Sequence, residues 1–95
     1  MDQQQINIDE QVRRLHEQLK KLNWPQPYMF KFIMPNERAT IDQVLEVLPD
    51  KAEPRFTQSK NGKYTCITCV ITMPSADAVL KVTTDACAIK GVMSL

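Results

Sequence analysis

The sequence has no long apolar run. All of its hydrophobic stretches fall short of the roughly 20 residues that a helix needs to cross a bilayer, so we expect no membrane span. The opening residues, MDQQQINIDEQ, are polar and acidic and contain no apolar core of a signal peptide, so we expect a cytoplasmic protein. With 95 residues, 43% hydrophobic and 24% charged, the chain suits one globular domain with a single modest core.

Histidine and glycine are scarce, with one and two residues respectively. His16 lies among charged residues of a predicted helix, where a solvated position is favoured over general-base chemistry. The sequence shows no glycine-rich phosphate loop, no nucleophile elbow and no carboxylate pair with acid–base spacing. We therefore expect a protein that is not an enzyme and that has no cofactor.

An excess of charge of either sign is also missing. The chain has 12 basic and 11 acidic residues, which gives a formal net charge of +1. A domain that binds nucleic acid through the backbone phosphates is usually far more basic than this. Nucleic acid is therefore not the expected partner.

Cysteine is limited to three residues, Cys66, Cys69 and Cys87. An odd number without an export signal fits reduced thiols better than a disulfide framework. Cys66 and Cys69 form a C-x-x-C motif within a predicted strand, where residues three apart point to opposite faces and cannot bind one ion. A zinc site would need two more ligands, and no spacing in the chain unites them. We expect no metal site.

Apolar residues with a helical period follow the polar start. Their steps of four and three predict an amphipathic helix with Asn7 as its N-cap, and their two heptads are too few to indicate a coiled coil. The segment NWPQP ends this helix because of its two prolines, and Trp24 is expected to anchor the crossing to the core. The chain thus divides into an N-terminal extension, residues 1–23, and a domain, residues 24–95. The apolar positions of the helix are Ile8, Val12, Leu15, Leu19 and Leu22.

The next two segments predict a strand and a helix. YMFKFIM, residues 28–34, alternates its side chains between two faces and ends at a proline, as a strand does. TIDQVLEVL, residues 40–48, predicts a short helix, with Thr40 and Gln43 in the positions of a capping box.

The strongest local pattern lies in residues 52–73, where two β-prone runs flank Asn61 and Gly62. Asn-Gly is the preferred pair for a two-residue type I′ turn, so the segment predicts a hairpin. This turn places Thr57 opposite Cys66. One face of the hairpin is then apolar and the other is mixed and rich in hydroxyls, which is typical of a half-buried antiparallel sheet.

The C-terminal part of the chain completes the fold. SADAVLKVTTDACAIK, residues 75–90, predicts a helix capped by Ser75, and VMSL predicts a short closing strand. After the first helix, the order of elements is therefore strand, helix, strand, strand, helix, strand. We predict an α+β protein with a ferredoxin-like βαββαβ antiparallel sheet, two helices on one face of it, and an extra N-terminal helix.

Three segments also carry a family resemblance. WPQPYMFKFIMP, SKNGKYTCITCVITMPSADAV and IKGVMSL together resemble the YbeD-like family of small uncharacterised bacterial proteins, over most of the chain from Trp24 to Leu95. The resemblance implies a fold similar to the ACT regulatory domain, which binds small effectors at subunit interfaces, and it implies no catalytic motif. The first loop, PNERAT, lacks the characteristic ligand-binding glycine, which weakens any transfer of amino-acid binding to this chain.

One face of the predicted sheet is a candidate interaction surface, because it mixes apolar, hydroxyl and basic side chains. We expect a non-catalytic regulatory or interaction module that uses this face to form a homodimer, to bind a small effector, or to bind a protein partner. As an alternative, the N-terminal helix covers the face within the same chain, and the sequence does not decide between them. The residues are Lys31, Ile33, Arg55, Thr57, Ser59, Tyr64, Cys66 and Thr68, with Met29 and Val70 beside them.

Two further hypotheses concern binding. Asn36, Arg38 and Thr40 lie at the start of the second helix, where free N–H groups attract a carboxylate or phosphate, although an ordinary solvated cap is favoured. The ferredoxin-like sheet is also the scaffold of RNA-binding domains. These domains read bases with paired aromatics, whereas Tyr64 is alone on this face, so RNA binding is disfavoured.

Overall fold

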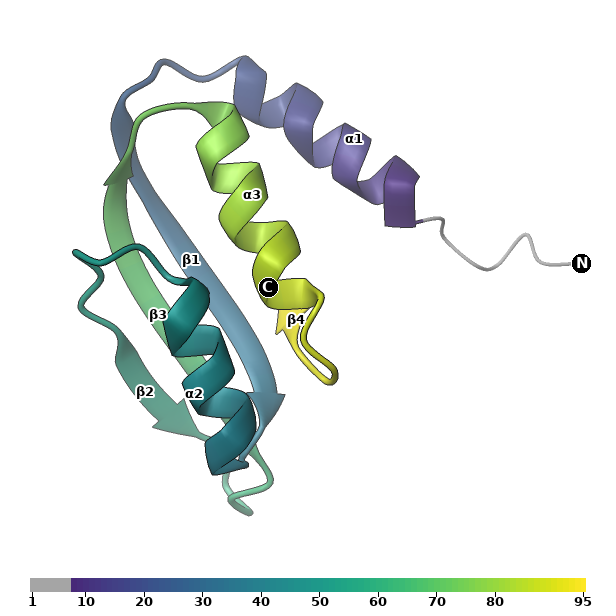
Figure 1. The fold of residues 1–95 in the computed structure, drawn as a ribbon, viewed down its shortest axis with the longest axis vertical. Helices are drawn as coiled ribbons and strands as arrows, with labels where there is room; N and C mark the ends of the chain where they lie inside the picture. The colour runs from purple at the N-terminus through teal and green to yellow at the C-terminus, as the bar shows by residue number, and fades with distance from the viewer. Residues whose placement is uncertain (1–7) are drawn as a thin grey trace, which may run out of the picture.

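A four-stranded antiparallel sheet carries two helices on one face, and a third helix lies beside them (Figure 1). The structure is a computed structural model that describes residues 8–95, with side chains from residue 10 onward, so the predicted N-cap Asn7 lies outside it. The strand order β2-β3-β1-β4 is the ferredoxin-like arrangement that the sequence predicts. The elements are α1 (Ile8–Lys20), β1 (Gln26–Pro35), α2 (Arg38–Val47), β2 (Arg55–Gln58), β3 (Tyr64–Met73), α3 (Ala76–Cys87) and β4 (Met93–Ser94).

The two central strands, β1 and β3, pair with each other along their whole length. The short strand β2 pairs with β3 and places Thr57 opposite Cys66, so the predicted register is confirmed. β4 adds a short edge to β1, with Met93 opposite Ile33. Because side chains alternate along each strand, one set points toward α2 and α3 and the other set points away from them.

The side of the sheet that faces the helices forms the core. Phe30, Phe32 and Met34 on β1 are almost completely buried, and each such side chain stabilises the fold by about 2 kcal/mol through burial alone. Aromatic rings continue this row toward the start of β1, since the ring centroids of Tyr28 and Phe30 lie 4.9 Å apart. The other large, fully buried apolar side chains are Ile67, Val44 and Val79.

The β2–β3 hairpin has the predicted register but not the predicted turn. The N–H of Ser59 donates to the carbonyl of Tyr64 at 3.0 Å, while the N–H of Gly62 donates to the carbonyl of Ser59 at 2.9 Å. Gly62 has a φ of +72°, but Asn61 does not have a positive φ, and a type I′ turn needs both. The prediction of a type I′ turn is therefore wrong. The Asn61 Oδ1 instead accepts bonds from the Ser59 hydroxyl and the Lys63 N–H.

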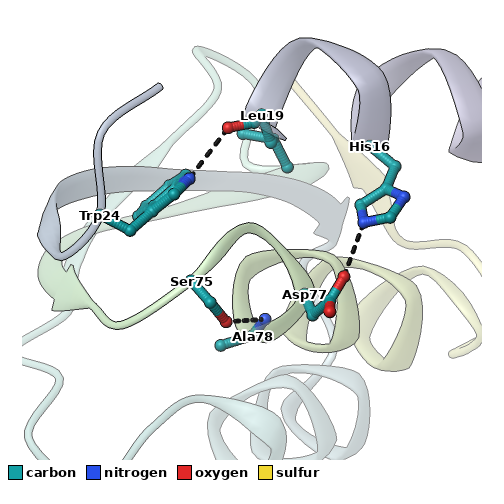
Figure 2. A network of polar contacts seen from close by, with 6 residues as sticks. All are labelled: His16, Leu19, Trp24, Ser75, Asp77 and Ala78. Atoms are coloured by element: carbon teal, nitrogen blue, oxygen red, sulfur yellow. Dashed lines mark hydrogen bonds and ion pairs between the residues drawn. The ribbon is translucent and has the colours of Figure 1, made fainter. Parts of the chain in front are cut away.

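Helix α3 begins where the sequence predicts. Its N-cap is Ser75, whose Oγ accepts a bond from the N–H of Ala78 at 3.1 Å (Figure 2). Asp77 lies in the first turn, where a negative charge is favourable. The helix ends at Cys87, before the predicted end, and Gly91 follows in a turn with a φ of +88°.

Helix α1 packs beside α3 and does not cover the other face of the sheet (Figure 1). Its predicted apolar stripe is only partly used: Leu19 is buried and Leu15 is half-buried, but Leu22 is 46% exposed. The alternative in which this helix covers the sheet within the same chain is therefore wrong. The division at residue 23 stays a prediction, although Leu19 joins the core of the domain.

A contact of Trp24 explains where α1 ends. Its indole Nε1 donates to the carbonyl of Leu19 at 2.9 Å, which satisfies an acceptor at the C-terminal end of the helix (Figure 2). The same ring packs against the core at a centroid distance of 6.4 Å from Tyr28. The predicted anchoring role of Trp24 is thus confirmed, and it holds α1 on the helical side of the sheet.

Candidate functional site

The face of the sheet that points away from α2 and α3 is exposed, and we call it the open face. Met29 and Val70, on the two central strands of the sheet, are 56% and 61% exposed. Most members of the predicted interaction surface lie on this face, and Ser59 follows directly after β2. By alternation along the strands, the open face consists of Met29, Lys31, Ile33, Arg55, Thr57, Tyr64, Cys66, Thr68, Val70 and Met93, with Leu95 beyond the end of β4.

The open face is ordered in rows that run across the strands. In the central row, Thr68 of β3 pairs with Arg55 of β2 on one side and with Lys31 of β1 on the other. Leu95 extends this row, because its N–H donates to the carbonyl of Lys31 at 2.8 Å. On one side of this row, Met29 pairs with Val70.

The row on the other side is also mostly apolar. Ile33 of β1 lies between Cys66 of β3 and Met93 of β4, and Thr57 of β2 completes the row. Ile33 and Cys66 are half-buried by their neighbours, while Met93 is exposed. The open face therefore has two apolar areas that are separated by a central polar row.

The charge of the open face comes from Lys31 and Arg55. Among the described side chains, neither of them has an ion-pair partner, whereas Arg38 and Lys81 on the helical side each pair with an aspartate four residues later. A cavity of about 330 Å³ lies beside Arg55. Its lining residues are Met29, Glu53, Arg55, Thr68, Cys69 and Val70.

The two cysteines of the C-x-x-C motif lie on opposite faces of β3, as the strand pattern predicts. Cys66 is half-buried on the open face, with its Sγ 3.8 Å from the hydroxyl of Thr68, and Cys69 is buried in the core. Burial raises the pKa of the Cys69 thiol, which keeps it protonated and unreactive. Within the described range, no three His, Cys, Asp or Glu side chains come together in a way that could hold a metal ion.

The predicted anion site involves three side chains that all have partners within the chain. The Asn36 amide donates from Nδ2 to the carbonyl of Gly62 at 2.9 Å and accepts from the Thr65 hydroxyl at 2.8 Å. Arg38 Nε lies 3.3 Å from the Asp42 carboxylate on the same helix. These contacts favour a structural role for this loop, and anion binding stays a prediction.

Thr40 does not cap α2, so that part of the prediction is wrong. The helix begins at Arg38 with Glu37 as its N-cap, and Thr40 is already inside the first turn. Its side chain is buried, and its hydroxyl bonds the Glu37 carboxylate at 3.4 Å. The helix therefore begins before the residue that the capping-box pattern indicates, and Asn36, just ahead of it, is bonded to the hairpin.

His16 is the position whose surroundings the sequence did not reveal. Its Nε2 lies 2.6 Å from Oδ1 of Asp77, so it joins α1 to the first turn of α3 (Figure 2). The predicted solvated position is confirmed only in part, because the imidazole is 31% exposed. The contact serves the packing of two helices and brings no nucleophile to the imidazole. Residues 61 positions apart give no local signal of such a pair.

Comparison with known proteins gives a family but no annotated relative. A family model described as a protein of unknown function, DUF493, matches residues 19–95. No curated protein and no solved structure matches the chain significantly. In the described part of the chain, every helix is too short or too polar to span a membrane.

Proposed function

Since this chain belongs to the DUF493 family, whose function is unknown, we propose its function from its own surface: it is a non-catalytic interaction module that binds a protein through the open face. The matched range contains all three segments that resemble the YbeD-like family, which supports that finer assignment. All three cysteines are free thiols, which supports a role in the cytoplasm.

The exposure of apolar side chains on the open face carries this proposal. Met29, Val70 and Met93 are each more than half exposed, although Met29 and Val70 lie on strands whose opposite side chains form the core. Scattered exposed apolar residues are normal, but apolar areas that are gathered on one face and border a polar row are characteristic of an interaction site. The helix that could have covered this face packs beside α3 instead.

A protein is a better occupant of this face than a small effector. Binding sites for small molecules are usually concave and enclose most of the ligand. The cavity beside Arg55 lies under only part of the open face, whereas the exposed apolar residues are spread over several strands. A broad, mixed surface of this kind suits the core and rim of a protein interface. The role of the module is regulatory if its binding changes the activity of the partner protein.

The test removes apolar surface from the open face without adding charge. In the double variant Met29→Gln, Val70→Thr, we expect proteins that copurify with the tagged chain from its native cells to be depleted at least tenfold. Leu22→Gln is the matched control, because it removes a similarly exposed apolar side chain outside the sheet. Quantitative mass spectrometry compares the recovered proteins, and circular dichroism checks that both variants fold.

Two outcomes would overturn the proposal. One is a set of copurifying proteins that is unchanged in the double variant. The other is that no protein copurifies with both the wild-type chain and the Leu22→Gln control. Self-association that is lost only in the double variant would identify a second copy of the chain as the occupant.

A further inference from the structure

Resting on the proposed function, we infer that the partner of the open face is an acidic and apolar protein segment. It places a carboxylate over Thr68, between Lys31 and Arg55, and lays apolar side chains on both sides of this central row. The inference adds the chemistry of the partner to the proposed function, and it can fail while that function stands.

The geometry of the central row suits one carboxylate. Neighbouring strands lie about 4.8 Å apart, so the backbones of Lys31 and Arg55, two strands apart, are separated by about 10 Å. The long side chains of both residues can reach a group above Thr68, which lies between them. A carboxylate there would accept bonds from an ammonium and a guanidinium, and charge-assisted bonds of this type are strong.

The two cations of the row form no ion pair with the described side chains. No described carboxylate lies within ion-pair distance of Lys31 or Arg55, and strand positions on the open face include no Asp or Glu. Glu53 lines the cavity beside Arg55 but forms no ion pair with it. Lys31 and Arg55 thus present positive charge in the middle of an otherwise apolar and hydroxyl-rich surface, which complements a negative charge on a partner.

The aromatic content and the charge of the open face argue against two other occupants. A single-stranded nucleic acid would also bring negative charge, but its bases stack on aromatic side chains, and Tyr64 is the sole aromatic residue of the open face. A second copy of the chain would bring its own Lys31 and Arg55 into the same layer, and the strand positions of the open face offer no Asp or Glu to pair with them. Like charges at an interface suppress such pairing.

The experiment selects binders from a random peptide library displayed on phage, with the full chain as the target. We expect the enriched peptides to carry Asp or Glu next to aliphatic residues. In synthetic form, such a peptide should bind at least tenfold more weakly to the double variant Lys31→Gln, Arg55→Gln. Binding to Lys60→Gln, Lys63→Gln should change less than threefold, because these exposed cations belong to the hairpin turn.

Each other outcome overturns the inference. Enriched peptides without acidic residues, or acidic peptides that bind both double variants equally, would show that Lys31 and Arg55 do not select a carboxylate. A library that yields no binder, or a chain that self-associates through this face, would exclude an acidic segment as its occupant. If neutral peptides bind the wild-type chain but not the double variant Met29→Gln, Val70→Thr, the partner is not acidic. The inference then fails, while the proposed function stands.

Discussion

Nε2 of His16 and Oδ1 of Asp77 lie 2.6 Å apart and form the polar contact that joins α1 to α3 (Figure 2). Because Asp77 is 84% exposed, solvent screens this pair, and we expect it to stabilise the fold modestly. His16→Ala should lower the free energy of unfolding by about 0.5–1 kcal/mol. Urea denaturation near neutral pH measures it, with Glu17→Ala as the control at a neighbouring exposed position. Equal effects of the two substitutions would contradict a role for the His16 contact.

The apolar stripe of α1 provides a second, larger prediction. Leu19 is 3% exposed and belongs to the core, whereas Leu22, from the same predicted stripe, is 46% exposed. Leu19→Ala should therefore lower the free energy of unfolding by about 2–4 kcal/mol, because it removes buried methyl groups and leaves a cavity. Leu22→Ala should cost less than about 0.5 kcal/mol. If both variants unfolded at the same urea concentration, α1 would not pack on the domain as described.

Asn36 connects the β1–α2 loop to the hairpin through both atoms of its amide group. Asn36→Ala leaves the Thr65 hydroxyl and the Gly62 carbonyl without this partner, so we expect a loss of about 1–2 kcal/mol in the free energy of unfolding. Arg38→Ala should change it by less than about 0.5 kcal/mol, because its pair with Asp42 is exposed. Thermal melts with and without phosphate provide the check. A phosphate-dependent stabilisation that disappears in Arg38→Ala would instead support the anion site.

Cys69 predicts how stability changes at alkaline pH. Burial raises the pKa of this thiol above its ordinary value of 9.0, so the folded chain retains a proton that the unfolded chain releases. The resulting stability is present below pH 9 and is lost as the pH rises through the folded pKa. We expect the free energy of unfolding to fall above about pH 9 and to fall less steeply in Cys69→Ala. Urea denaturation across this pH range compares the slopes, and identical slopes would contradict the assignment.

The order of elements and the hairpin register were predictable because they depend on local patterns. Alternation along residues 28–34 and 64–73 assigns each side chain to a face, and the pairing of Thr57 with Cys66 follows once the turn is located. The Ser75 cap is equally local, since donor and acceptor lie three residues apart. The composition of the open face could therefore be obtained from the sequence.

The errors arise where distant residues compete with a local preference. The Asn36 side chain reaches the hairpin 26 residues away, and there the Asn61–Gly62 pair does not form its preferred turn. The position of α1 depends on Leu19 in the core and on the contact between His16 and Asp77. A helical period shows that a helix has an apolar side, but it does not show which surface will receive it. Whether the open face is covered could thus be decided only from the structure.

The most direct test of the central claim is site-specific photo-crosslinking in the native cells. A benzophenone amino acid replaces Val70 on the open face or, as the control, Gln43 on the exposed side of α2. We predict discrete crosslinked products of one or a few masses at Val70 and none of comparable yield at Gln43. Products that form at Gln43 but not at Val70, or equally at both, would show that the open face of the sheet is not the interaction surface of this protein.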